Sequence, residues 1–163
     1  KIALSRDCIK PWDMSKWLTV EYHKEKGILN VEDQDSLRTI DDICAIFDTT
    51  PKHRGFLRMG TTPVPGKENF EIWYPNINNR SGWSNELSPD GETFTEYNKD
   101  EKKREEHVAD CINDNKKRIA FFRTKDALGI ELYRFAGVFH LNTDATREKG
   151  KCIWHRDSKI YEL

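Results

Sequence analysis

Three aromatic side chains and several short amides lie close together in the middle of the chain. Trp73, Tyr74 and Trp83 fall within eleven residues. Aromatic faces stack on nucleic-acid bases with roughly 1 to 3 kcal/mol per base, and Asn and Asp side chains pair with the polar edges of bases. We therefore predict that this region binds a base, with the candidate residues Trp73, Tyr74, Asn76, Asn79, Trp83, Asn85 and Asp90.

The two tryptophans differ in their surroundings, so the prediction has an alternative. Trp73 follows Phe70 and Ile72 in a predicted strand, which favours a core residue as the alternative explanation. Trp83 stands between two small residues in a loop-rich stretch, which favours exposure and a binding role. The short polar residues around both are alternatively explained as turn formers.

Cationic side chains are concentrated in the last third of the chain. From Lys116 to Leu163 there are eleven Lys and Arg against six Asp and Glu, although the whole chain has a net charge of −1. The net charge argues against a generic polyanion binder, whereas the basic last third favours a local patch that contacts nucleic acid. The alternative is that the excess only solubilises exposed strand faces.

Four arginine and lysine residues are the candidates for phosphate contacts. Residues two apart on a strand point the same way, so Arg123 and Lys125 can grip phosphates in register. Their alternative role is to pair with Asp126 and Glu131 across the predicted hairpin. The predicted phosphate-binding residues are Arg80, Arg118, Arg123 and Lys125.

Two pairs of residues have the spacing of zinc ligands. His107 and Cys111 are one turn apart on a predicted helix, and Cys152 and His155 follow later in the chain. However, Cys111 belongs to the buried stripe of that helix, and residues 152 and 155 would point to opposite faces of a regular strand. We therefore expect no metal. The chain also has no Gly-rich phosphate loop or nucleophile elbow, and no cofactor is expected.

Hydrolytic chemistry is the main alternative to binding. Asp90, Glu101 and Lys103 imitate the spacing of a metal-dependent nuclease, but the last two lie on a highly charged predicted helix where such matches arise by chance. A small metal-dependent nuclease is thus one alternative function. Another is a protein-interaction module that uses the same aromatics as a hydrophobic anchor.

The elements that must position these residues are short strands and helices in alternation. Helices are predicted from about Asp13 to a stop at Gly27, and over 36–47, 100–115 and, as a single turn, 144–150. Strands are predicted over 56–59, 70–74 and 93–97, in a long hairpin over 117–141, and from 152 onward. Gly137, in the middle of the second hairpin strand, indicates a bulge where a small sheet closes on itself. The predicted fold is α+β: a curved, partly closed mixed β-barrel with helices packed outside.

The length of 163 residues predicts one domain, 1–163, with a single core. No apolar run approaches the roughly 18 to 20 residues of a membrane span, so no membrane partner is expected. The chain begins at Lys1 without a methionine, which predicts a fragment of a larger protein with an effector domain elsewhere. Four widely separated cysteines predict free thiols in a reducing cytoplasm, with two long-range disulfides as the alternative.

The run from Tyr133 to Phe139, continued from Cys152 to Arg156, resembles the closing strands of the PUA-like superfamily. That group includes the SRA, EVE and YTH readers of modified bases and the recognition domains of modification-dependent restriction enzymes. The resemblance implies a curved sheet whose concave side accepts a flipped base, stacked on aromatics and read along its polar edge. We therefore expect a recognition domain that reads a modified base in double-stranded DNA and targets an effector nuclease in the parent chain.

Overall fold

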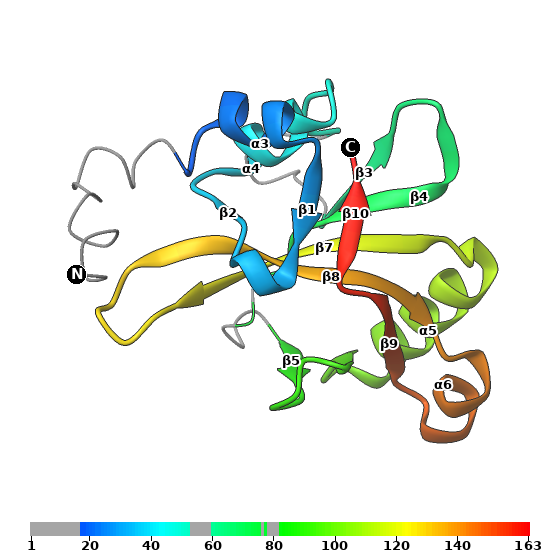
Figure 1. The fold of residues 1–163 in the computed structure, drawn as a ribbon. Helices are drawn as coiled ribbons and strands as arrows, with labels where there is room; N and C mark the ends of the chain where they lie inside the picture. Colours follow the sequence, from blue (N-terminus) through cyan, green and yellow to red (C-terminus); the bar gives the residue numbers. More distant parts are fainter. Residues whose placement is uncertain (1–16, 53–59, 76, 78–81) are drawn as a thin grey trace.

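The computed structural model describes residues 17–52, 60–75, 77 and 82–163 (Figure 1). Its helices are α3 (Val20–Lys26), α4 (Ile40–Ile46), α5 (Glu101–Asp114) and α6 (Thr143–Lys149), with a short 3-10 helix η1 (Val31–Asp33). Its strands are β1 (Ile28–Asn30), β2 (Ser36–Leu37), β3 (Thr61–Val64), β4 (Lys67–Trp73), β5 (Trp83–Leu87), β6 (Thr93–Asn98), β7 (Lys117–Lys125), β8 (Glu131–Leu141), β9 (Cys152–Ser158) and β10 (Ile160–Glu162).

The main sheet has the strand order β3-β4-β7-β8-β9-β6-β5, and β2 adds to it against β8. β4 and β7 are parallel, whereas the other neighbours are antiparallel, so the sheet is mixed. β1 and β10 form a separate pair. The α+β class is confirmed. The partly closed barrel is not, because β3 and β5 stay unpaired with each other in the part of the chain that the structure describes.

The sheet is nevertheless strongly curled. The rings of Phe94 on β6 and Phe122 on β7 stack with centroids 4.7 Å apart, although β8 and β9 lie between these strands in the sheet order. Trp73 on β4 likewise contacts Trp154 on β9, at 5.2 Å between centroids. Such contacts require the two ends of the sheet to bend toward each other. The resulting inner face holds a cluster of buried side chains: Trp73, Phe94, Cys111, Ala120, Phe122, Phe139, Leu141, Cys152 and Trp154.

The helices cover the sheet on different sides, as Figure 1 shows: α3 and α4 lie together at one end of the molecule, and α5 and α6 at another. α3 and α4 contribute to a second core, which includes Ile43, Cys44, Phe121 and Phe135. None of the helices in the described ranges has the length and hydropathy that a membrane span needs. Cys111 and Cys152, two of the cysteines in these ranges, are free thiols.

Local signals located α5 well. The Asp100 side chain accepts a hydrogen bond from the Lys103 amide at 3.0 Å, and Asn115 ends the helix in the left-handed conformation. The helix predicted over 36–47 is shorter than expected, because Ser36 and Leu37 pair with β8 as strand β2. The predicted strand 56–59 lies outside the described residues.

The predicted bulge at Gly137 is confirmed. Gly137 has φ +112°, and the pairing register shifts close to it on both sides of β8, between Ala120 and Phe121 and between Val138 and Phe139. A Cβ at this position would lie 2.5 Å from the Ser158 carbonyl oxygen. Only glycine therefore fits where β9 crosses the bend in β8.

We expect Gly137→Ala to lower the free energy of unfolding by about 2 kcal/mol or more, because it combines an unfavourable φ with a backbone clash. Urea denaturation measures the loss. Gly129→Ala is the matched control, since Gly129 has φ +81° but nothing within 4 Å of its added Cβ. Equal losses in the two variants would mean that the clash at Gly137 contributes nothing.

Candidate nucleic-acid interface

Strand β5 supplies one wall of the curled sheet. Directly opposite residues of an antiparallel pair point to the same face. The register pairs three β5 residues with three buried β6 residues: Trp83 with Asn98, Asn85 with Glu96, and Leu87 with Phe94. The β5 residues therefore form a row toward the inner face, opposite the aromatic cluster.

A pocket of about 360 Å³ opens at the end of this face. It lies between the β5–β6 turn and the neighbouring parts of β7, β8 and β9. Its apolar lining includes Leu87, Phe122 and Phe135, and its charged lining includes Asp90, Arg134 and Arg156. The volume falls in the range of small-ligand sites, about 300 to 1,000 Å³. An aromatic wall beside a few polar groups suits a planar ring with a hydrogen-bonding edge.

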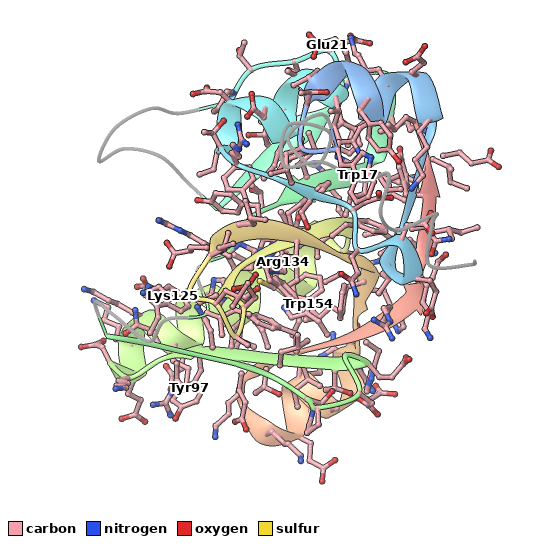
Figure 2. The ribbon with its side chains drawn as sticks, turned by 60° about the vertical axis from the view of Figure 1, so that its left-hand side comes forward. Trp17, Glu21, Tyr97, Lys125, Arg134 and Trp154 are labelled. Carbon is pink, nitrogen blue, oxygen red and sulfur yellow. The ribbon has the colours of Figure 1, made fainter. Side chains whose placement is uncertain are left out.

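The charged groups of the pocket are fixed by short contacts. The Arg134 guanidinium donates to Thr124 Oγ1 and to the Ile130 carbonyl oxygen, each at 3.1 Å. The Arg156 guanidinium donates to the Ala136 carbonyl oxygen at 3.2 Å and to the Asp90 carbonyl oxygen at 3.3 Å. Arg156 thus joins β9 to β8 and to the β5–β6 turn. Figure 2 shows Arg134 and Trp154 within the body of the fold, away from Trp17 and Glu21 beside α3.

Asp90 both forms the turn and stands at the pocket. Its Oδ1 accepts hydrogen bonds from Ser88 Oγ at 2.6 Å and from the Glu92 amide at 3.0 Å. The hydrogen bond from Ser88, followed by that from Glu92, lowers the pKa of the Asp90 carboxyl below its usual value. Asp90 is therefore ionised near neutral pH, as an acceptor for a base amino group must be.

A buried polar network lies on the same inner face, where α5 packs against it. Glu96 Oε1 lies 3.0 Å from His107 Nε2, accepts from Trp154 Nε1 at 3.2 Å, and is 3.8 Å from Arg118 Nη1. Burial acts to raise the pKa of Glu96, but the hydrogen bond from His107 and the charges of His107 and Arg118 outweigh it and lower that pKa. The Trp83 ring rests edge-on against His107, at 4.8 Å between centroids.

The same network shifts three neighbouring groups. Burial opposes the charge of His107, yet its contacts with Cys111 and Glu96 raise its pKa to about 10. The hydrogen bond between the two thiols lowers the pKa of Cys111 to about 6 and raises the pKa of Cys152. The cations of His107 and Arg118 thus favour the charged forms of Glu96 and Cys111.

The structure places some of the predicted base-binding residues in the core and others on the inner face of the sheet. Trp73 points to the inner face but is only 2% exposed among other aromatic rings, so it packs as a core residue, its alternative explanation. Tyr74 was also predicted to bind the base, but its ring packs in the second core and its hydroxyl lies 2.6 Å from Thr62 Oγ1. Trp83 and Asn85 face the interior of the curled sheet. Asn76, Asn79 and Arg80 lie outside the described residues.

The predicted phosphate-binding residues include one buried and two outward-pointing side chains. Arg118 was predicted to contact phosphate, but it is 8% exposed, and its guanidinium lies 4.2 Å from the Trp154 ring and 3.8 Å from both Glu71 and Glu96. Arg123 and Lys125 alternate with inward residues of β7 and point outward. Arg123 pairs with Glu131, as its alternative role predicted, whereas Lys125 is exposed and has no ion pair among the described residues.

Three of the four residues with the spacing of zinc ligands lie together, but with a different fourth residue. Glu96 joins His107, Cys111 and Cys152, whereas His155 lies on the other side of β9, 3.4 Å from Thr93 Oγ1. The opposite orientation of residues 152 and 155 was predicted. Glu96 was missed because its position depends on the β6–β9 register, which the local sequence does not encode.

The residues of the nuclease alternative are not brought together. Asp90 precedes β6, while Glu101 and Lys103 follow it on α5. A strand of this length spans roughly 20 Å at about 3.3 Å per residue. The three side chains therefore stand at opposite ends of β6.

Comparisons with known proteins agree with this geometry. The family model of the SET and RING associated (SRA) domain matches residues 21–163. A search of curated proteins finds no match. Among solved structures, the 5-hydroxymethylcytosine-specific restriction enzyme AbaSI is similar, with a TM-score of 0.77 and 26% identity over 98% of this chain and 50% of that one. The chain spans half the length of that enzyme.

Proposed function

We propose that this chain, which belongs to the SRA family, recognises a modified cytosine in double-stranded DNA. The observation that carries the proposal is the similarity of almost the whole chain to an enzyme specific for 5-hydroxymethylcytosine. The curled sheet with an aromatic pocket at its open end supports it further. Because the chain spans half of that enzyme, we place the effector nuclease in the remainder of the parent protein.

The base reaches the pocket by flipping out of the duplex, since its Watson–Crick edge and its ring faces are covered while it is paired and stacked. The inner face offers two kinds of contact. At the pocket, Asp90 supplies a carboxylate beside the apolar surface of Leu87 and Phe122. Further along β5, Trp83 and Asn85 supply a ring and an amide toward the same inner face. A carboxylate suits the exocyclic amino group of cytosine, which is a hydrogen-bond donor.

The direct test compares three duplexes that differ at one base: cytosine, 5-methylcytosine or 5-hydroxymethylcytosine. Binding is measured by fluorescence anisotropy at about 0.15 M salt. The Debye length is near 8 Å there, so the salt limits sequence-independent binding to the phosphates. We expect the hydroxymethylated duplex to bind most tightly. A 2-aminopurine placed beside the modified base should brighten on binding, because unstacking removes its quenching. Equal affinity for the three duplexes would contradict the proposal.

Of the predicted phosphate-binding residues that the structure describes, Arg123 and Lys125 of the β7–β8 hairpin point outward and remain candidates. We expect Arg123→Ala with Lys125→Ala to weaken binding to all three duplexes by the same factor. The slope of log K against log salt should become shallower by about 0.9 for each phosphate that is no longer neutralised. Lys24→Ala with Lys52→Ala removes the same charge elsewhere on the domain. An unchanged affinity for the hairpin variant, or an equal loss in the control, would remove the phosphate role.

A further inference from the structure

A thiol, imidazole and carboxylate cluster lies where α5 packs against β6 and β9. Glu96, His107, Cys111 and Cys152 each offer a ligand atom, and these atoms all lie within 4.8 Å of one another. Cysteine sulfur, histidine nitrogen and carboxylate oxygen are the ligands of protein zinc sites. We propose that these four residues form a structural zinc site.

The fold produces the cluster from two pairs of neighbours. Glu96 and Cys152 are directly opposite each other in the β6–β9 ladder, so their side chains lie side by side on the inner face. His107 and Cys111 are one turn apart on α5 and share the face that packs against this ladder. A metal at their meeting point joins the helix to two strands that are distant in sequence.

The distances already approach those of a tetrahedral site. Zinc-to-ligand bonds of about 2.0 to 2.3 Å place neighbouring ligand atoms about 3 to 4 Å apart. His107 Nε2 lies 3.0 Å from Glu96 Oε1 and 3.6 Å from Cys111 Sγ. Small side-chain rotations therefore suffice to arrange the ligands around one ion.

The charges around the cluster balance when a divalent ion is added. Two thiolates and one carboxylate exceed the charge of Zn²⁺ by one negative unit. Arg118 supplies the compensating cation, because its Nη atoms lie 3.8 Å from Glu96 Oε1 and 3.9 Å from Cys111 Sγ. The Trp154 indole N–H, 3.2 Å from Glu96 Oε1, orients that ligand.

Two other arrangements compete with the metal. Glu96, His107 and Arg118 form ion pairs without it, but such a network gives the two thiols no function. A disulfide between Cys111 and Cys152 is the second competitor. The zinc site requires all four ligands and does not depend on the proposed DNA function, so its test is independent of DNA binding.

The test uses the full chain, kept reduced, incubated with Zn²⁺ and freed of excess metal by gel filtration. We expect one zinc ion per chain by elemental mass spectrometry. Replacement by Co²⁺ should give thiolate charge-transfer absorption and the visible bands of a tetrahedral ion. A chelator should lower the melting temperature. Cys152→Ser and Glu96→Gln should lose the metal, whereas Cys44→Ser, in the second core, and Cys8→Ser should keep it.

Three results would overturn the site. One is a folded wild-type chain that retains no zinc. Another is an equal loss of metal in Cys44→Ser. The third is a Cys111–Cys152 disulfide in the protein purified without reductant. Where Cys152→Ser does not fold, the Co²⁺ spectrum of the wild type decides, since absent thiolate absorption refutes cysteine ligation.

Discussion

Trp83→Ala should abolish the preference for a modified base while leaving the melting temperature nearly unchanged. The ring faces the interior of the curled sheet from the edge strand β5, and its one ring–ring contact among the described residues is with His107. Stacking on an aromatic ring contributes roughly 1 to 3 kcal/mol per base, so the loss in affinity for the preferred duplex is about 5- to 150-fold. Anisotropy with the modified and unmodified duplexes measures this loss.

Trp17→Ala is the matched control for Trp83. Trp17 is 43% exposed and lies beside α3, away from the inner face (Figure 2). Its removal takes away a ring of the same kind, and we expect discrimination to persist. A large fall in the melting temperature of Trp83→Ala would instead make Trp83 a core residue. Retained discrimination by a stable variant would place the reading of the base elsewhere on the domain.

Elements set by neighbouring residues were predictable from the sequence. Asp100 and Asn115 delimit α5 because each satisfies the end of the helix locally, and Gly137 is required by a backbone conformation that other residues avoid. The pattern of β8 and β9 also indicated the PUA-like superfamily, and the SRA match over residues 21–163 confirms it. These features need little information from distant parts of the chain.

Side-chain contacts that depend on strand pairing between distant parts of the chain were not predictable from the sequence. Arg118 was grouped with Arg123 and Lys125 as a phosphate contact, because all three are cationic residues of one predicted strand. Only the curl of the sheet brings Glu96 and Trp154 to Arg118. The pocket residue Arg156 was missed for the same reason, since its partners on β8 and in the β5–β6 turn are remote in sequence. Propensity does not encode such registers, and one-residue shifts reverse which side chains face inward.

Arg118→Met should lower the free energy of unfolding by about 3 to 5 kcal/mol, the usual cost of removing one partner from a buried ion pair. Methionine keeps an apolar stem against the Trp154 ring but leaves Glu96 without its guanidinium, 3.8 Å away. Urea denaturation monitored by tryptophan fluorescence measures the change. Arg123→Met, on the exposed side of the same strand, should alter stability by no more than about 0.5 kcal/mol.

A double-mutant cycle separates the charge effect from packing. Adding Glu96→Gln to Arg118→Met removes the carboxylate that has lost its guanidinium and keeps only His107 as a cationic partner, so the second change should cost less in this background than in the wild type. If Arg118 gripped phosphate instead, Arg118→Met would keep its stability and lose affinity for every duplex, with a shallower salt dependence. Such a result would require the guanidinium to leave the inner face on binding DNA, which would break its contacts with both Glu71 and Glu96.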